Sequence, residues 1–284
     1  MGWERRVLQG KTVLVTGAAS GLGRAIAVYA GHNGATVALS DINLPEAEDV
    51  ARLIHDDGGD AEVYCVDVTN DREVEEFVRV VALRHGGIDY LFNNAGYAQN
   101  GEFQDISPAG FRYVFDVDFW GVVYGTRAAY PIMIKQGYGT IANIISLAGL
   151  IPGGLMTAYG AAKHAANGFT LNLRSEAKLY GVNVVAVCPG YLETPMHANA
   201  ENVTEYVRNH DAEYLSRKHP FPSAERVVGH LMRGVLRNKA IVVSPPTQKV
   251  FWWLFRLVPG LIPAAWASII RRIKVKEERK GARV

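Results

Sequence analysis

The chain alternates short runs of apolar, β-branched residues with longer segments that have the apolar period of a helix. Runs of the first kind predict strands at Thr12–Thr16, Thr36–Ser40, Glu62–Asp67, Tyr90–Asn93, Thr140–Ile145, Asn183–Cys188 and Ala240–Val243. Segments of the second kind predict helices at Leu22–Gly31, Pro45–Asp56, Asp71–His85, Pro108–Gln136, Ala158–Tyr180 and Ala224–Arg237. Alternating strands and helices are typical of βαβ units, in which helices cover both faces of a parallel sheet. The sequence therefore predicts an α/β fold with a doubly wound, seven-stranded parallel sheet.

The chain is expected to form one large domain, because 284 residues with 49% hydrophobic content can fill a single core. We place this domain at residues 1–247 and treat residues 248–284 as a hydrophobic and basic C-terminal extension. The formal net charge of +2 is too small to indicate a nucleic-acid partner. Because the first 11 residues lack the apolar run of a signal peptide, we expect a cytoplasmic location.

The first predicted strand runs directly into a glycine-rich turn, TGAASGLG, and then into a helix. Gly17, Gly21 and Gly23 allow a tight turn and a close approach of the backbone to a ligand. The free N–H groups and the positive dipole end of the following helix favour a phosphate. Such a sequence can also be no more than a tight turn, but its position between the first strand and a helix indicates a pyrophosphate site.

The second predicted strand is followed by Asp41, about 20 residues past the glycines, where a carboxylate can accept hydrogen bonds from an adenosine ribose. Neither Ser20 nor Ile42 offers the cation that would neutralise a 2′-phosphate. These positions favour NAD(H) over NADP(H) as the cofactor. The alternative is that Asp41 is an ordinary surface turn residue, because aspartate is common in turns.

Tyr159 and Lys163 stand four residues apart in the sequence YGAAK, so on a helix they share one face. A nearby ammonium stabilises a phenolate and lowers the pKa of a tyrosine toward the range useful for acid–base chemistry. Ser146 follows the fifth predicted strand, and its hydroxyl can donate to a substrate oxygen. A Tyr-x-x-x-Lys pair alone is typically an amphipathic surface pair, but this one follows the glycine-rich turn and Ser146 in chain order.

These motifs, in this order, resemble the short-chain dehydrogenase/reductase family over roughly residues 8 to 245. The resemblance implies a Rossmann-type domain and hydride transfer between a nicotinamide and a carbonyl or alcohol. It also implies that Ser146, Tyr159 and Lys163 are the catalytic set. In that set Tyr159 is the general acid or base, and Lys163 also binds the nicotinamide ribose.

The same resemblance implies which residues contact the cofactor. The pyrophosphate is assigned to the glycine-rich turn, the adenosine ribose to the end of the second strand, the adenine to the end of the third, and the nicotinamide to the stretch after the sixth. The residues so implied are Gly17, Ser20, Gly21, Leu22, Gly23, Asp41, Asp67, Val68, Asn94, Ala95, Gly96, Tyr159, Lys163, Pro189, Gly190, Leu192 and Thr194.

Asp118 stands where the family usually carries an asparagine, in the sequence VDFWG instead of Val-Asn-x-x-Gly. In the family this asparagine helps to hold a water of a proton relay through its backbone, so Asp118 can preserve the role, and we include it among the candidate catalytic residues. A buried carboxylate near Lys163 can instead pair with the ammonium and change the pKa of Tyr159. A third interpretation makes Asp118 a helix-surface residue without a role.

Residues 191–223 are polar and irregularly patterned, which predicts a mobile loop over the substrate. Three histidines lie in this loop: His197, His210 and His219. They lack metal-ligand spacing, so we expect solvated histidines and no metal site. The two cysteines, Cys65 and Cys188, each lie in an apolar run and are expected to be buried in strands.

Residues 250–270 are apolar and rich in aromatic side chains, and a basic tail follows them. Because Arg256, Pro259 and Pro263 interrupt this stretch, we expect two short interfacial helices rather than one spanning helix. Tryptophans and cations of this kind favour peripheral contact with an anionic membrane through residues 250–284. A hydrophobic lid on the substrate pocket and a subunit contact are the alternatives. All three interpretations favour a hydrophobic substrate.

The expected function is NAD(H)-dependent hydride transfer to or from a lipophilic secondary alcohol or ketone. Because cellular NAD pools are kept oxidised, alcohol oxidation is the expected direction. The resemblance also implies a homodimer or homotetramer, assembled through residues 108–136 and 158–180. Two other functions stay open: a non-catalytic NAD(H)-binding sensor or scaffold, and an NADPH-dependent carbonyl reductase.

Overall fold

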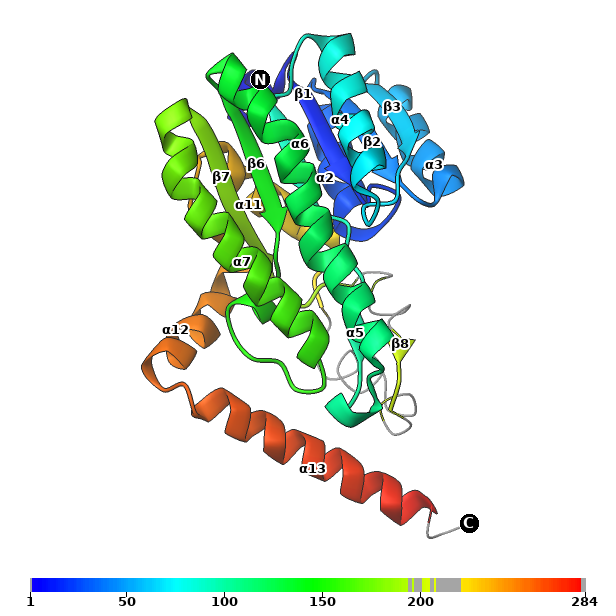
Figure 1. Ribbon diagram of the computed structural model, residues 1–284, viewed down its shortest axis with the longest axis vertical. Helices are drawn as coiled ribbons and strands as arrows, with labels where there is room; N and C mark the ends of the chain where they lie inside the picture. Colours follow the sequence, from blue (N-terminus) through cyan, green and yellow to red (C-terminus); the bar gives the residue numbers. More distant parts are fainter. Residues whose placement is uncertain (1, 194–195, 197–200, 205–206, 208–220, 282–284) are drawn as a thin grey trace.

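The computed structural model describes residues 2–193, 196, 201–204, 207 and 221–281 of the chain. These residues form a parallel sheet of seven strands in the order β3-β2-β1-β4-β6-β7-β9 (Figure 1). The strands are β1 (Thr12–Thr16), β2 (Thr36–Asp41), β3 (Asp60–Cys65), β4 (Tyr90–Asn93), β6 (Gly139–Ile144), β7 (Val182–Pro189) and β9 (Ile241–Ser244). The predicted α/β fold with a seven-stranded parallel sheet is therefore confirmed.

Helices cover both faces of this sheet, which is why strands β1 and β6 are buried along their whole length. On one face lie α2 (Gly21–His32), α3 (Leu44–Asp56) and α11 (Ala224–Leu236). On the other, in front in Figure 1, lie α4 (Asp71–His85), α6 (Gly121–Gln136) and α7 (Thr157–Ala177). Apolar side chains of each helix layer pack on the sheet and form two separate hydrophobic cores.

Shorter elements connect these layers. They are α1 (Trp3–Leu8), β5 (Gln99–Asn100), β8 (Glu201–Asn202) and the single turns η1 (Phe103–Asp105), η3 (Leu147–Gly149), η4 (Lys178–Tyr180) and η5 (Pro246–Gln248). Strands β5 and β8 pair in parallel outside the main sheet. Strand β1 lies between β2 and β4, so successive strands are added on opposite sides of β1. Parallel sheets bind ligands at such a switch point, beyond the carboxyl ends of the strands.

The predicted helix at residues 108–136 is not continuous. It is divided into α5 (Pro108–Phe115), a π-helical turn η2 (Asp116–Trp120) and α6. A π-helical turn adds a residue to the helical repeat and is frequent at functional sites. In this chain the wider turn contains Asp118, whose side chain is completely buried.

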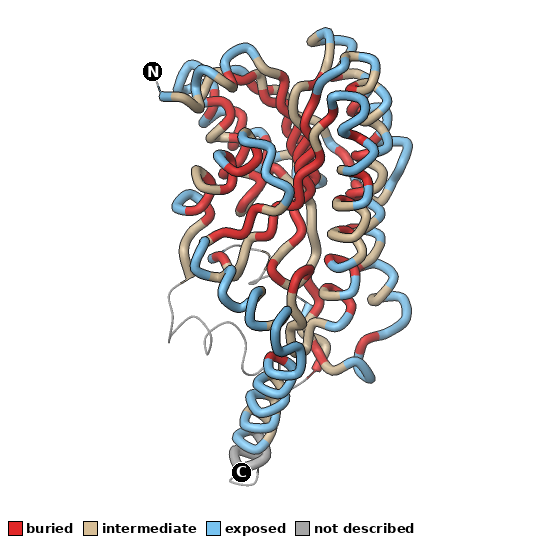
Figure 2. Tube along the Cα trace, turned by 90° about the vertical axis from the view of Figure 1, so that its left-hand side faces the viewer, coloured by how far each residue is buried: buried red, intermediate tan, exposed pale blue. Residues whose placement is uncertain are grey.

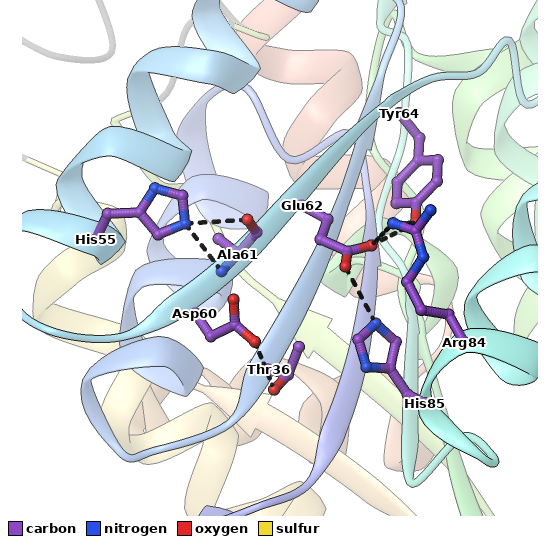
Figure 3. Close-up of polar contacts among 8 residues, drawn as sticks. All are labelled: Thr36, His55, Asp60, Ala61, Glu62, Tyr64, Arg84 and His85. Carbon is purple, nitrogen blue, oxygen red and sulfur yellow. Dashed lines mark hydrogen bonds and ion pairs between the residues drawn. The ribbon is translucent and has the colours of Figure 1, made fainter.

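Strand β3 begins and ends two residues earlier than the predicted strand, because it is an edge strand that is only partly buried. Cys65 at its end is exposed, contrary to the prediction, whereas Cys188 in β7 is buried as predicted. Figure 3 shows the polar contacts along this edge, where the Glu62 carboxylate accepts hydrogen bonds from the Tyr64 hydroxyl at 2.5 Å and from Arg84 at 2.7 Å. Charged side chains on an edge strand hinder its pairing with another chain.

The C-terminal extension forms two helices, α12 (Lys249–Leu257) and α13 (Leu261–Gly281), separated by a break where the prediction placed one. Pro263 does not interrupt the second helix as expected, because it lies in the first turn, where proline is tolerated. With 21 residues, α13 is also longer than predicted. Figure 2 shows α13 projecting from the body of the protein with mostly exposed residues.

Within the described residues, no single helix is long and apolar enough to cross a bilayer. The two segments Pro246–Leu257 and Leu261–Lys276 meet the length and hydropathy criteria only together, and they are bent by 107° relative to each other.

Candidate active site

A cavity of about 540 Å³ lies beyond the carboxyl ends of the central strands. Its lining contains nearly all of the predicted cofactor and catalytic residues: Gly17, Ser20, Gly21, Leu22, Asp41, Asp67, Val68, Asn94, Ala95, Gly96, Ser146, Tyr159, Lys163, Pro189, Gly190 and Leu192. Gly23 and Asp118 are not part of the lining, but each contacts a residue that is: Gly23 packs on Gly17, and Asp118 pairs with Lys163. Thr194 and the histidines 197, 210 and 219 lie outside the described residues.

The glycine-rich turn is shaped by close packing against the segment after β4. Gly17 has a φ of +64°, and a Cβ on it would meet the Ala95 Cα at 2.7 Å. A Cβ on Gly23 would lie 2.0 Å from the Gly17 carbonyl oxygen, so Gly23 permits the packing of the turn rather than touching the cavity. The Asn94 side chain donates hydrogen bonds to the carbonyl oxygens of Thr16 at 2.9 Å and Gly17 at 3.0 Å. The turn is thus fixed at the N-terminus of α2, where backbone N–H groups can hold a pyrophosphate.

The Asp41 carboxylate is held over this turn at the end of β2. One of its oxygens accepts a hydrogen bond from the Ala19 N–H and the other from the Asn43 N–H, both at 2.9 Å. The neighbouring Ile42 is 67% exposed and apolar. Among the described residues that line the cavity, Lys163 is the only lysine or arginine, and it lies at the other end of the site.

Ser146, Tyr159 and Lys163 meet at the end of β6 and the start of α7. Tyr159 and Lys163 are one helical turn apart and buried, and the Lys163 Nζ lies 5.7 Å from the centre of the Tyr159 ring. The Ser146 side chain accepts a hydrogen bond from the Ala148 N–H at 3.1 Å. Ser146 itself has a φ of 148° and a ψ of 161°, a backbone conformation that is strained for any residue with a side chain.

A family model for the short chain dehydrogenases matches residues 11–204 of the chain. The chain belongs to the short-chain dehydrogenase/reductase family. It is 36% identical over 237 residues to SadH of Mycobacterium tuberculosis, a protein described as an oxidoreductase, and the match covers 83% of this chain and 86% of that protein. The protein is therefore an oxidoreductase of this family.

Solved structures of the family show the same fold with either cofactor. A Burkholderia phymatum short-chain dehydrogenase/reductase in complex with NAD superposes with a TM-score of 0.80 at 25% identity, covering 89% of this chain and 95% of that one. A metagenomic short-chain oxidoreductase in complex with NADP has a TM-score of 0.63 at 34% identity, covering 65% of this chain and 84% of that one. The two neighbours show that the family fold accommodates both cofactors.

Asp118 forms an ion pair with Lys163, another of the candidate catalytic residues. The Asp118 carboxylate is completely buried, and its Oδ1 lies 2.9 Å from the Lys163 Nζ. The backbone N–H of Tyr97 points at both carboxylate oxygens, 3.4 Å from each. Lys163 also donates to the Ile144 carbonyl oxygen at 3.0 Å. The interpretation of Asp118 as a helix-surface residue is therefore wrong, and its pairing with Lys163 is observed.

Three neighbours act on the Tyr159 phenol. Burial raises the pKa of Tyr159, and the Asp118 carboxylate raises it further, whereas the Lys163 ammonium and a hydrogen bond with Ser146 lower the pKa. The balance leaves the pKa of Tyr159 above the ordinary value. The predicted effect of Lys163 has the expected direction, but burial and Asp118 outweigh it in this site.

The sequence analysis missed much of the apolar end of the cavity. Its wall is formed by Tyr97, Ile151, Met156, Tyr191, Met196 and Trp266. Trp266 comes from α13, and a Cβ on Gly154 would meet its ring at 2.7 Å, so α13 packs closely on the loop before α7. Trp266 belongs to the stretch 250–270, for which a hydrophobic lid on the substrate pocket was one of three interpretations, and its side chain lines the cavity.

Proposed function

We propose that this oxidoreductase uses NAD(H) to transfer a hydride to or from a lipophilic secondary alcohol or ketone. The observation that carries the proposal is the meeting of Ser146, Tyr159 and Lys163 in one cavity with the glycine-rich turn. A phosphate-binding turn and a phenol with a neighbouring ammonium are the two parts that this chemistry needs. The residues present therefore fit a nicotinamide dinucleotide along the strand ends.

The protein groups have separate roles in the proposed reaction. A nicotinamide cofactor held by the glycine-rich turn and Lys163 would supply the hydride acceptor or donor. In the oxidative direction, Tyr159 takes the hydroxyl proton as the carbinol hydrogen leaves with its electron pair, and in the reductive direction it returns that proton to the oxygen. The Ser146 hydroxyl donates to the same oxygen and stabilises its negative charge. The Lys163 ammonium, held by Asp118, favours the ionised phenol that takes this proton in the oxidative direction and that is left behind in the reductive direction.

The preference for NAD(H) is supported by the position of Asp41. Its carboxylate is fixed at the adenosine end of the cavity, where it would repel a 2′-phosphate and accept hydrogen bonds from ribose hydroxyls. We expect Asp41→Ala to weaken NAD binding, because it removes the charged acceptor of the ribose hydrogen bonds. It should also reduce the discrimination against NADP about tenfold or more, because the carboxylate no longer repels a 2′-phosphate. Equilibrium binding of NADH and NADPH to both proteins measures this ratio. An unchanged ratio would contradict the role of Asp41.

A lipophilic substrate is supported by the apolar side chains that line the cavity, among them Ile151, Met156 and Trp266.

The family resemblance supports assembly into a homodimer or homotetramer through the segments 108–136 and 158–180. Trp120 and Tyr113, which lie in or beside these helices, are both more than two-fifths exposed and offer an apolar surface for such a contact. The mass of the protein in solution, measured by light scattering, tests the assembly. We propose a cytoplasmic location for the protein.

The decisive experiment measures formation of NADH from NAD, or of NADPH from NADP, with a panel of lipophilic secondary alcohols, for the wild type and for Tyr159→Phe. Turnover with NAD that is lost in the variant supports the proposal. Turnover preferring NADP would instead favour a carbonyl reductase. Tight NADH binding without turnover across the panel would favour a sensor or scaffold, and Tyr159→Phe would then leave NADH binding unchanged.

A further inference from the structure

In the part of the chain that the structure describes, α12, the start of α13 and the residues between them carry a group of exposed apolar side chains. We call it the C-terminal apolar surface, and it consists of Val250, Phe251, Trp253, Leu254, Leu257, Val258 and Leu261. Each of these residues is more than a third exposed, and Leu257 is 78% exposed. Exposed aromatic and branched side chains are normal when scattered, but a gathered patch of this kind indicates a binding surface.

The helices that carry this surface are themselves fixed to the body of the protein. Trp252, on α12, packs against the small hydrophobic cluster that includes Val243 at the end of the sheet. On α13, Trp266 packs on Gly154 and lines the cavity, and Lys274 forms an ion pair with Glu102. These contacts hold both helices on the body of the protein, while the residues of the C-terminal apolar surface stay exposed. This arrangement distinguishes the surface from a loose tail that would fold back on the core.

The two helices carry an excess of positive charge. Residues 249–281 contain two glutamates, Glu277 and Glu278, and eight lysines and arginines, which gives this segment a formal charge of +6. The whole chain has a formal charge of only +2, so the remainder of the chain carries a net negative charge. Positive charge is thus concentrated on the two helices that expose the apolar surface. An anionic partner complements this distribution.

We infer that the C-terminal apolar surface binds an anionic lipid bilayer, with α12 and the start of α13 lying in the interface. Tryptophans beside apolar residues and cations are the composition that favours this position. Basic residues near an anionic leaflet add about 1 kcal/mol each to the attraction. The bend of 107° between the helical segments allows both to lie against the surface rather than to form one straight span.

A second copy of the chain is a poorer occupant of this surface. In a twofold interface the same surface meets itself, so the cations of both copies would be brought together. Like charges across an interface disfavour that pairing, whereas anionic headgroups neutralise the cations. The exposed apolar side chains and the cations are therefore both complementary to an anionic bilayer, whereas a second copy of the chain complements only the apolar side chains.

The bound position also has a consequence for the substrate, and this step rests on the proposed function. Trp266 connects the two regions, because it lines the cavity and lies on α13, whose first residue, Leu261, belongs to the C-terminal apolar surface. A lipophilic alcohol dissolved in the bilayer would then reach the cavity without crossing water. Membrane binding itself needs no turnover, so it is tested separately from activity.

The test is flotation of the purified protein with vesicles of phosphatidylcholine alone or mixed with phosphatidylglycerol. We compare the wild type with Leu257→Asp and with Leu83→Asp, a control on α4 in which a 70% exposed leucine receives the same charge. The wild type and Leu83→Asp are expected to float with the anionic vesicles, and Leu257→Asp to bind them about tenfold or more weakly. Arg271→Ala with Arg272→Ala is expected to reduce the preference for anionic over neutral vesicles.

Absence of flotation by the wild type would overturn the inference, as would equal binding to neutral vesicles or an equal loss in Leu83→Asp. A lower solution mass of Leu257→Asp, seen by light scattering without vesicles, would also overturn it and assign the surface to a second copy. Tyr159→Phe should float as the wild type does. A protein that floats but turns over no alcohol would leave the membrane inference standing and contradict the proposed function alone.

Discussion

Two clusters in this protein contain the same three kinds of side chain, a tyrosine, a carboxylate and a cation, and their surroundings differ. Tyr159, Lys163 and Asp118 are buried beside the cavity. Tyr64, Glu62 and Arg84 lie along the exposed edge of the sheet (Figure 3). In both clusters burial is the largest cause that raises the pKa of the tyrosine, and the pKa of Tyr64 is raised to about 12.

The clusters differ in the partner of the carboxylate. Glu62 accepts a hydrogen bond from Tyr64 itself, which keeps the proton on that phenol. Asp118 pairs instead with Lys163 and leaves the oxygen of Tyr159 to Ser146 and the cavity. The same residue types therefore give a structural contact at the edge and a proton-transfer candidate in the interior. The role of each tyrosine depends on whether the carboxylate accepts its proton in a hydrogen bond or pairs with the neighbouring cation.

The largest expected difference is in turnover. Tyr159→Phe should lower kcat by about a hundredfold to ten-thousandfold, because it removes the proposed acid–base group. Tyr64→Phe should leave kcat unchanged, since the edge cluster is outside the cavity. Steady-state rates of both variants with an accepted alcohol measure the contrast. A residual rate near wild type in Tyr159→Phe would break the comparison between the clusters.

The next effect is on stability. Asp118→Ala leaves the buried Lys163 ammonium without its counter-ion, and we expect a loss of about 3–5 kcal/mol in the free energy of unfolding. Asp118→Asn keeps a polar group beside Lys163 and should lose less. Urea unfolding followed by circular dichroism measures both values. An Asp118→Asn variant as stable as the wild type would show that the charge of Asp118 contributes nothing to the fold.

A smaller effect is expected in the pH dependence of oxidation. The rate should rise as Tyr159 ionises, and the negative charge of Asp118 raises the pKa of Tyr159. In Asp118→Asn that charge is gone, so the pKa of Tyr159 falls and the rising limb of kcat should move to lower pH. Glu62→Gln, the matched change in the edge cluster, should leave the profile in place. A limb that moved to higher pH would show that Asp118 acts mainly by keeping Lys163 protonated.

The smallest effect belongs to Glu62. Burial raises the pKa of this carboxyl, but hydrogen bonds from Tyr64 and Arg84 outweigh burial and leave the pKa lowered. A lowered pKa stabilises the folded state above the ordinary carboxyl pKa, and this contribution is lost as the pH falls through the lowered value. The stability difference between wild type and Glu62→Gln should therefore be small at neutral pH and vanish in acid. Urea midpoints down to about pH 3 test this. A difference that grew in acid would contradict the assignment.

The sequence predicted best those parts whose signal is local. The central strands were placed to within a residue because their apolar runs are buried on both faces, as in β1 and β6. Strand β3 was shifted because an edge strand is only partly buried, and its pattern of polar and apolar residues does not mark its ends. The π-helical turn at Asp116–Trp120 has no proline or glycine inside it, so nothing in the sequence indicated where the helix changes.

The candidate site was predicted through its motifs, and its missing parts come from distant contacts. Ser146, Tyr159, Lys163 and Asp41 were found because each follows a strand end or shares a helix face. The ion pair of Asp118 with Lys163 was one of three interpretations, since only the packing of two helices decides which side chain faces Asp118. Trp266 contacts Gly154, which is more than a hundred residues away in the sequence, and no spacing rule predicts such a contact.

The strained backbone at Ser146 has a consequence for anyone who improves this protein in the laboratory. A side chain at a φ of 148° and a ψ of 161° costs about 1–3 kcal/mol that glycine would not incur. A library selected only for heat resistance would therefore enrich glycine at position 146 and discard the hydroxyl proposed to hold the substrate oxygen. Directed evolution of this chain needs a catalytic screen at every round, because thermal robustness and turnover favour opposite residues at this position.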